Sequence, residues 1–550
     1  MLQPSSSASV LGDFSQSRIT LRGTSYRLHV KPDGYFINEQ LLSGGEREHR
    51  VDYTLGSRRI QHYLTRLADG RIIVLPPSWD VLRKQWFHNF DIVDPQETEG
   101  GAVQVWNKSC YSCHVTREEK NFDAASNTYN TTWQDFGTSC ERCHGQGAGH
   151  MLLHRETPAN SSGDDITRLG GLDPARSTAV CAQCHSLRDM LTKTFAPGQN
   201  YLDSFMPILE YGQKKDHDPA YWVDGRPRRF SNDAIGFWQS ACFMRGDATC
   251  LSCNANVHDP AIPANRIIRE EPNALCSGCH GTLSINVANH SHHAAGSRGS
   301  ECVECHMPRS VFSLKAEIRD HSMSIPDPEN TLRHGIPNAC GNCHRNRDAT
   351  WAADRVRSWY GPDSGRKEIH RAKAFRAAGA GDKAAIPLLL SILNEASEGT
   401  LARANALGHL SRFPADERVV KALQNSLQDP DPLLRAVAAV RAVGSEGLSV
   451  ALADPVRSVR VGAAFSIVNL RVQIPAGKSA DALESVSREY EERASILADD
   501  GPEQFNLGGF ELLRGNPAAA EKAFRASMKL DGRLPSLLPR VRMAGAEAAR

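Results

Sequence analysis

Hydrophobic and polar residues alternate in the first part of the chain with the two-residue period of a half-buried β-strand. Tyr26, Leu28 and Val30 occupy every second position, and a Lys-Pro-Asp-Gly turn sequence follows them. A second turn sequence, at residues 68–70, separates two further runs rich in Tyr, Leu, Ile and Val. Residues 1–100 therefore predict a small β-rich region built from hairpins.

Periodicity is poor over residues 101–350, where Gly, Asn, Asp and Ser are frequent and all 15 cysteines lie. A segment of this kind buries too little aliphatic surface to fold by itself. Covalently bound cofactors can supply the missing apolar core, much as metals do in small domains. We expect an irregular, mostly α-helical domain that depends on its cofactors.

The apolar spacing becomes helical in residues 351–475, where Ala and Leu dominate. An Asp-Pro-x-x-x-Leu/Val-Arg-x-x-Ala-Ala string at residues 429–439 recurs at residues 454–464 and resembles HEAT-type helical repeats. Pro430 and Pro455 are expected to open helices, where a missing N–H is harmless. This part of the chain therefore predicts an α-solenoid of HEAT-like repeats.

Residues 476–550 contain one further repeat-like pattern. Leu507, Gly508, Ala520 and Phe524 have the spacing of a single tetratricopeptide repeat. One repeat cannot bury its own apolar face, so it must stack on neighbouring helices or on repeats outside this chain. We predict an incomplete tetratricopeptide-like repeat.

Composition argues against two kinds of partner. Lys plus Arg (64) balances Asp plus Glu (63), whereas phosphate binding normally leaves a basic excess, so no nucleic acid is expected. No apolar stretch approaches the roughly 18–20 residues of a membrane-spanning helix, so no transmembrane segment is expected. Residues 1–13 lack the basic and apolar regions of a secretory signal. The oligomeric state has no signature in the sequence.

Fourteen of the cysteines form seven Cys-x-x-Cys pairs, and Cys242 stands alone. In six of the pairs a histidine directly follows the second cysteine, which is far more often than chance would give. The six motifs are Cys110/Cys113/His114, Cys140/Cys143/His144, Cys181/Cys184/His185, Cys276/Cys279/His280, Cys302/Cys305/His306 and Cys340/Cys343/His344.

This spacing suits haem c, which is tethered by thioether bonds from two cysteines to its two vinyl groups. Cysteines three positions apart can reach both vinyl groups, and the next residue places an imidazole under the iron. Zinc ribbons do not require a histidine after each second cysteine. A disulfide framework favours scattered cysteines, and a thioredoxin-like redox motif would occur once. The motifs therefore predict six covalent haem c groups.

The seventh pair, Cys250 and Cys253, is followed by Asn254, which is not a useful ligand of haem iron. His258 lies four residues further on. Three outcomes stay open: a seventh haem with His258 as proximal ligand, a seventh haem ligated from elsewhere in the chain, and a degenerate site that forms a disulfide. We favour the seventh haem.

A second axial ligand for each iron must come from histidines outside the motifs or from methionine, which would raise the reduction potential. Enough histidines are present for widespread ligation by two imidazoles. His290, His292 and His293 precede the motif at Cys302, and we place His293 among the expected ligands. The candidates are His88, His150, His154, His217, His258, His290, His292, His293, His321 and His334.

The string Cys-Glu-Arg-Cys-His-Gly-x-Gly-x-x-His at Cys140–His150 resembles the signature of the multihaem cytochromes that include hydroxylamine oxidoreductase and pentahaem nitrite reductase. The motif order over roughly residues 10–361 is more closely similar to multihaem cytochromes with C-terminal tetratricopeptide or HEAT repeats. The matching pieces are Cys302–Pro308, Asp320–Ser322, Pro337–His344, Trp351 and Trp359–Gly361.

This resemblance implies an exported electron carrier with stacked haems, in which His150 ligates a neighbouring haem and His321 is the next distal ligand. Proteins of this group usually begin with a signal peptide and one more Cys-x-x-Cys-His motif, so we expect a truncated start here. They also normally have histidine where Asn254 stands. Because bacteria attach haem c outside the cytoplasm, we expect a periplasmic or otherwise exported location.

The preferred function is electron transfer between redox partner proteins, with a partner docked on the helical repeats and no catalytic residue. The alternative is an oxidoreductase that acts on a small inorganic nitrogen or sulfur compound at one haem with an open distal site. We would place that site at Cys250 and Cys253, with Tyr211 and His217 as acid–base groups. The Cys-x-x-Cys-Lys motif that marks the catalytic haem of pentahaem nitrite reductase is absent. A third reading, a scaffold in which haem is structural filler, would not need six attachment sites.

Overall fold

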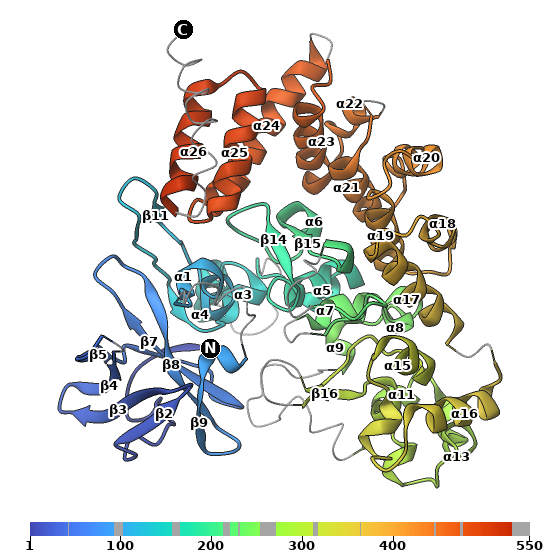
Figure 1. Ribbon diagram of the computed structural model, residues 1–550, viewed down its shortest axis with the longest axis horizontal. Helices are drawn as coiled ribbons and strands as arrows, with labels where there is room; N and C mark the ends of the chain where they lie inside the picture. The colour runs from blue at the N-terminus through green and yellow to red at the C-terminus, as the bar shows by residue number, and fades with distance from the viewer. Residues whose placement is uncertain are drawn as a thin grey trace.

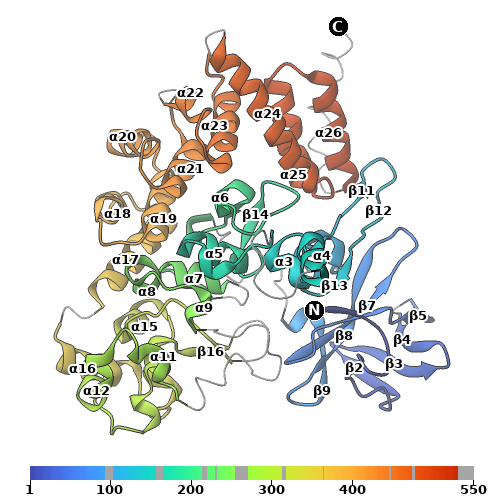
Figure 2. The same cartoon turned by 180° about the vertical axis from the view of Figure 1, so that it is seen from behind.

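The computed structural model describes residues 1–41, 43–92, 103–156, 165–212, 220–228, 232–253, 271–311, 317–362, 365–444, 447–473 and 477–530. The chain runs from a β-rich region, through short helices and loops, to a curved row of helices that returns toward the start (Figure 1). Figure 2 shows the same path from behind. Within these ranges, no helix is both long enough and apolar enough to cross a bilayer.

Two antiparallel sheets form the N-terminal region, which confirms the predicted β-rich start. One sheet has the strand order β1-β6-β7-β8-β9, and the other has the order β2-β3-β4-β5. Both predicted turns are present, one between β3 and β4 and one between β7 and β8. The strands are β1 (Leu2–Pro4), β2 (Arg18–Leu21), β3 (Thr24–Lys31), β4 (Gly34–Gln40), β5 (Glu46–Arg50), β6 (Tyr53–Leu55), β7 (Ile60–Arg66), β8 (Ile72–Asp80) and β9 (Gln85–His88).

The facing sides of the two sheets enclose an apolar cluster. Tyr26 and Leu28 of β3 pack in this cluster with Tyr63 of β7, and all three are nearly inaccessible to solvent. Fully burying a large apolar side chain contributes roughly 1.5–3 kcal/mol, so such clusters hold the region together. The alternation of burial ends before Val30, which pairs with Tyr35 beside the hairpin turn and is 58% exposed.

The cysteine-containing segment consists of short helices joined by turns and two-stranded ribbons, as its poor periodicity predicts. Its first half contains η1 (Asn89–Asp91), α1 (Trp106–Ser109), α2 (Tyr111–His114), β10 (Val115–Thr116), β11 (Phe122–Asp123), β12 (Thr128–Tyr129), β13 (Asp135–Phe136), α3 (Cys140–His144), α4 (Ala148–Glu156), η3 (Leu169–Gly171), α5 (Pro174–Ala182), β14 (Arg188–Met190), α6 (Tyr201–Ser204), β15 (Phe205–Pro207) and η4 (Glu210–Gly212). Its second half contains α7 (Asp233–Trp238), α8 (Ala241–Gly246), α9 (Cys250–Cys253), α11 (Ala274–Ser277), α12 (Gly281–Ile285), α13 (Val287–Ser291), η5 (Arg298–Ser300), α14 (Cys302–His306), β16 (Arg309–Val311), β17 (Glu317–Arg319), α15 (Pro328–His334) and η6 (Ala339–Asn342).

The C-terminal helices share one buried core with this segment. Tyr201, Phe205 and Ile235 belong to the same apolar cluster as Phe375 and Leu407. The aliphatic surface that residues 101–350 lack is therefore partly supplied from the other end of the chain. The helices are α16 (Ala349–Tyr360), α17 (Arg366–Gly379), α18 (Ala385–Asn394), α19 (Thr400–Leu410), α20 (Glu417–Ser426), α21 (Pro432–Arg441), α22 (Leu448–Ala451), α23 (Arg457–Asn469), α24 (Lys478–Ile496), α25 (Gly501–Leu513) and α26 (Pro517–Leu530).

The first aspartate of each copy of the sequence repeat pairs with an arginine that lies earlier in the chain. Arg403 Nη2 lies 2.8 Å from Asp429 Oδ2, and Arg435 Nε lies 2.7 Å from Asp454 Oδ2. Both aspartates belong to the Asp-Pro pairs, and their side chains are largely buried at 13% and 9% exposure. The recurring aspartates therefore form ion pairs along the row of helices. The recurring alanines are buried in the apolar core.

The prediction that the repeat prolines open helices is wrong. α21 begins two residues after Pro430, at Pro432, and α23 begins two residues after Pro455, at Arg457. In both repeats the aspartate before the proline accepts the backbone N–H of the residue two positions on, at 2.9 and 2.8 Å. This side-chain turn carries the chain past the proline before the helix starts.

The row of helices closes on the β11–β12 ribbon (Figure 1). Asp499, between α24 and α25, lies 2.7 Å from Lys120 Nζ and accepts the Tyr129 hydroxyl at 2.9 Å. The Lys120 and Asp499 side chains are only 9% and 3% exposed, and burial lowers the pKa of Lys120. Lys529 Nζ also donates to the carbonyl oxygen of Ala125, at 2.6 Å. Two distant parts of the chain are thus joined by buried charge.

We predict that Asp499→Ala frees α25 and α26 from the ribbon, because it leaves the Lys120 ammonium buried without a partner. Removing one member of a buried ion pair costs about 3–5 kcal/mol. Native-state hydrogen exchange should show lower protection of the α25 and α26 backbone amides. Lys120→Met combined with Asp499→Asn keeps the Tyr129 contact without any charge and should restore most of the protection. Equal loss of amide protection in the two variants would contradict the role assigned to the Lys120–Asp499 pair.

Candidate haem sites

Each Cys-x-x-Cys-His motif forms a single helical turn. The carbonyl of the first cysteine accepts the N–H of the histidine at 3.1 Å for Cys110, 2.9 Å for Cys181, 2.8 Å for Cys276 and 2.9 Å for Cys340. The other two motifs are the helices α3 and α14. Residues at i, i+3 and i+4 share one face of a helix, so the two thiols and the imidazole lie on one side of each turn.

The apolar core is thinnest where the motifs are densest. Between residues 271 and 348, the only apolar side chains that are buried in the described parts are Val303, Pro328, Ile336 and Ala339. Nevertheless, three motifs lie there, together with three further histidines whose rings contact a motif histidine or a tryptophan. A segment with so little buried aliphatic surface needs a large apolar body, and a haem at each motif would supply one.

Several motif histidines are oriented through their Nδ1 atoms. His144 Nδ1 lies 2.7 Å from a backbone carbonyl oxygen, His306 Nδ1 lies 3.0 Å from the Ser324 carbonyl oxygen, and His185 Nδ1 lies 2.8 Å from Asp233 Oδ2. Metal-ligating histidines usually donate their second ring N–H to such acceptors, which fixes the ring and leaves Nε2 for the metal. These contacts fit iron ligation.

His114 is held by burial instead. Its surroundings lower its pKa to about 4, mainly because burial penalises the charged form. The ring is therefore the neutral imidazole, which is the form that binds iron.

His280, the predicted iron ligand of the fourth motif, differs from these histidines. It stands directly before α12, it is exposed to solvent, and its side chain caps no N–H of that helix. The structure therefore does not place His280 in the fixed or sheltered position that its prediction as a ligand implies. The physical reason is the thin apolar core around this motif, which leaves the ring uncovered. The charge of His280 still acts on His306, so the two motifs are neighbours, and ligation by His280 stays a prediction.

Two pairs of histidines have the spacing of ligands on opposite faces of one iron. The rings of His290 and His306 are 6.1 Å apart between centroids and nearly parallel, at 9°. The rings of His293 and His344 are 6.0 Å apart at 40°. With metal–nitrogen bonds of about 2 Å, two imidazoles on one metal have ring centres roughly 6 Å apart. Each pair combines one motif histidine with one of the candidates named from the sequence.

Two other candidates have different partners. His292 stacks on Trp359 with ring centroids 4.5 Å apart and an angle of 10°. His88 Nδ1 accepts the Phe90 N–H at 3.1 Å, so the proton of its neutral ring is on Nε2. His88 therefore caps the N-terminus of η1 and is poorly prepared to ligate iron.

The remaining candidate iron ligands have different surroundings. His150 and His154 lie on α4 with their rings 4.5 Å apart. His321 Nδ1 lies 3.2 Å from Asp233 Oδ1. Burial lowers the pKa of His334. His217, Asn254 and His258 lie outside the described residues.

Tyr211, which the sequence offered as an acid–base group, belongs instead to the interface with the C-terminal helices. A Cβ atom on Gly408 of α19 would collide with its ring, and the Arg441 guanidinium lies 5.6 Å from the ring centre. The Tyr211 N–H donates to Asn405 at 3.2 Å. Its ring therefore fills a packing position, and burial raises its pKa.

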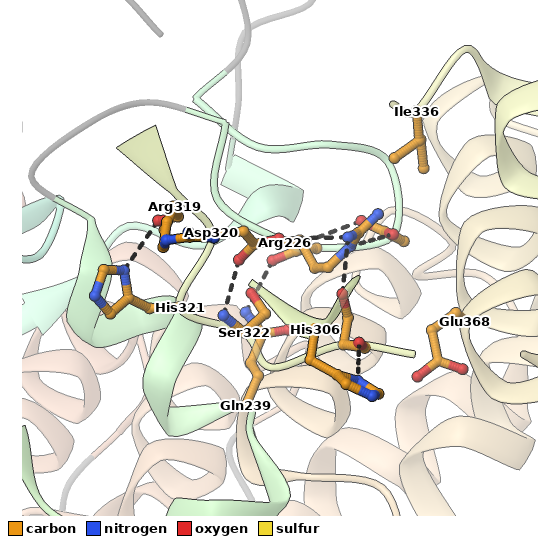
Figure 3. A network of polar contacts seen from close by, with 12 residues as sticks. Arg226, Gln239, His306, Arg319, Asp320, His321, Ser322, Ile336 and Glu368 are labelled. Atoms are coloured by element: carbon orange, nitrogen blue, oxygen red, sulfur yellow. Dashed lines mark hydrogen bonds and ion pairs between the residues drawn. The ribbon is translucent and has the colours of Figure 1, made fainter. Parts of the chain in front are cut away.

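A buried polar network positions the loop between β17 and α15 (Figure 3). Arg226 Nη1 donates to Ser324 Oγ at 3.1 Å and lies 3.3 Å from Asp320 Oδ2. Ser324 in turn supplies the carbonyl oxygen that holds His306. In Figure 3, His306 and His321 lie on opposite sides of Asp320, so one loop serves two histidines.

Sequence reasoning missed Asp233 and Arg226. Neither lies in a motif, and their partners are far away in the chain, so no spacing pattern reveals them. Asp233 contacts His185 and His321, and these contacts help to hold its pKa well below the usual carboxyl value despite its burial.

Thiols of different motifs also contact one another. The thiols of Cys113 and Cys184 lie close enough for their charges to interact, and so do those of Cys276 and Cys302. Haems attached at such motifs would be direct neighbours. No group of three or more His, Cys, Asp and Glu side chains in the described part of the chain is arranged around a common metal position.

The first two motifs fall within a recognised family segment. The family described as cytochrome c554 and c-prime matches residues 89–145. Among solved structures, the chain is similar to the crystal structure of outer cell wall cytochrome OcwA, with 18% identity and a TM-score of 0.42, over 71% of this chain and 87% of that one. No curated protein matches the chain.

The family match and the repeated motifs define a multihaem c-type cytochrome. Its cofactor is haem c, and the donor set of the turns fits that group.

We predict that Arg226→Met unfolds the loop that holds His306. The substitution leaves the carboxylates of Asp224 and Asp320, 1% and 8% exposed, without their cation. Loss of one partner from a buried ion pair costs about 3–5 kcal/mol. Hydrogen exchange over residues 317–324 should rise, and Arg226→Lys should show a smaller increase because it keeps the charge. Unchanged protection in Arg226→Met would contradict this role.

Proposed function

We propose that the protein carries electrons between redox partners outside the cytoplasm, through stacked haem c groups that mostly have two histidine ligands. The observation that supports this most directly is the pairing of His290 with His306 and of His293 with His344 at about 6 Å. An iron with protein ligands on both faces has no position for a substrate. Only electron transfer through the haem then remains.

The chain's own residues would tune these haems. Bound haem supplies a reversible one-electron couple. The carbonyl and carboxylate partners of His144, His306 and His185 strengthen these rings as ligands, and a more basic axial ligand favours the oxidised iron. The contacts between thiols of neighbouring motifs would bring haems close together, which suits rapid electron transfer.

The helical part supports a role in docking. We propose HEAT-like repeats over residues 351–475 and a tetratricopeptide-like repeat in residues 476–550. The inner helices α19 and α23 already contact η4 and α6. One of these contacts joins His409 Nε2 to Glu210 Oε2 at 2.5 Å. A redox partner would therefore dock on the outer helices α18, α20 and α22, which lie on the rim in Figure 1.

Export follows from the cofactor. Bacteria attach haem c outside the cytoplasm, so a chain with six regular attachment motifs must be exported to mature. We propose a periplasmic or other extracytoplasmic location.

The His290 and His293 assignments are tested by single alanine substitutions. His290→Ala and His293→Ala should each convert one low-spin haem into a five-coordinate haem that binds CO. Electron paramagnetic resonance and the CO difference spectrum of the reduced protein report both changes.

His292→Ala is the matched control for these variants. This residue lies in the same short stretch but stacks on Trp359, so its removal should leave the spectra unchanged. A CO response in His292→Ala, or none in the other two variants, would refute the ligand pairs. A CO response already present in the unaltered protein would favour the oxidoreductase.

A further inference from the structure

The thiol contacts arrange the attachment sites in a definite order. The charge of Cys113 in the first motif interacts with that of Cys184, and the charge of Cys143 in the second motif interacts with that of Cys181. The third motif thus adjoins both earlier ones. The first three motifs therefore form one group.

The last three motifs form a second group. The thiol of Cys276 lies close enough to Cys302 for their charges to interact, and the thiol of Cys305 lies equally within reach of the charges of Cys340 and Cys343. None of the thiol interactions described so far connects this group to the first one.

The irregular pair, Cys250 and Cys253, occupies the position between the two groups. The thiol of Cys250 lies close enough to Cys181 of the third motif for their charges to interact, and the charge of Cys253 interacts with that of Cys279 in the next motif. The helical turn of this pair, α9, packs against α5, which carries Cys181. Its two cysteines are spaced and coiled like those of the regular motifs.

The geometry at Asp233 separates His321 from the haem of the third motif. Asp233 Oδ2 contacts His185 Nδ1 and Asp233 Oδ1 contacts His321 Nδ1, at 2.8 and 3.2 Å. Two imidazoles on opposite faces of one iron direct their Nε2 atoms at each other, so their Nδ1–H groups point apart. One carboxylate cannot accept from both in that arrangement. His321 must therefore serve a different iron from His185.

The nearest site that lacks its own histidine is the irregular pair. Asp233 lies close enough to Cys250 for its charge to act on that thiol, so Asp233, His321 and α9 share one neighbourhood. His321 is further fixed by the Arg319 carbonyl oxygen, 3.0 Å from its Nδ1, and its Nε2 is the atom suited to a metal.

We propose that Cys250 and Cys253 hold a seventh haem, with His321 as one of its two protein ligands, that links the two groups of three haems into one electron path. This inference rests on the proposed function. Attachment needs no added oxidant or reductant: each thiol sulfur bonds to a vinyl carbon and its hydrogen passes to the other vinyl carbon. No leaving group is released.

Peptide mapping of the exported, purified holoprotein by mass spectrometry tests the attachment. The peptide that contains Cys250 and Cys253 should carry one haem, and Cys250→Ser/Cys253→Ser should lower the haem content by one per chain. Cys242→Ser is the matched control and should retain every haem. An irregular peptide with free thiols or a disulfide, beside six haem-bearing peptides, would overturn this inference and leave the proposed function intact. Haem-free peptides throughout would overturn both.

The ligand is tested by combining substitutions. His321→Ala in the otherwise unaltered chain should keep all seven haems and render one of them able to bind CO. In the Cys250→Ser/Cys253→Ser background the same substitution should add no CO-binding haem. A CO-binding haem that appears in that background as well would show that His321 ligates another iron. No change in either background would exclude His321 as a ligand.

The link itself is tested by electron flow. Each protein is partly reduced, with fewer electrons than it has haems. In the Cys250→Ser/Cys253→Ser variant these electrons should redistribute among the haems in two separate kinetic phases. In the unaltered protein they should redistribute in one phase. A single unaltered phase in the variant would contradict the bridging role.

Discussion

The central constraint on this molecule is that two thiols and one imidazole share a single helical turn. That turn orients three bonds toward one cofactor, and its repetition at six places leaves little room for an ordinary apolar core. Between residues 271 and 348 the described chain buries few apolar side chains, yet it brings histidine rings to about 6 Å from one another. The haems would thus be both the redox groups and the interior of this segment.

The C-terminal helices supply the rest of the packing around the cysteine-containing segment. Phe375 and Leu407 share a cluster with Tyr201 and Phe205, and the buried Lys120–Asp499 pair joins the last helices to an early ribbon. The helices therefore enclose the cytochrome segment rather than extend from it as a free arm. Only their outer side is available for a redox partner, and this limits where electrons can enter near the helices.

Local patterns predicted much of this structure, whereas long-range contacts escaped prediction. The turn after Val30 and the helices after residue 349 follow from alternation, turn residues and helical spacing, and the motifs themselves specify their own geometry. The expectation that Pro430 and Pro455 open helices is wrong, because a turn held by the aspartate before each proline comes ahead of the helix. Asp233, which joins His185 to His321, leaves no trace in sequence spacing, since its partners are remote in the chain. His290 and His293 could be named as candidate ligands, but the sequence could not pair them with His306 and His344.

The most direct test of this account is the covalent haem content of the exported, purified protein, measured by pyridine haemochrome and combined with a CO difference spectrum of the reduced form. The account predicts seven haems per chain and no response to CO, since every iron would carry two protein ligands. Zinc in place of covalent haem would contradict the class of protein. A full complement of haems with one that binds CO would contradict the electron-carrier role and indicate a site for a substrate.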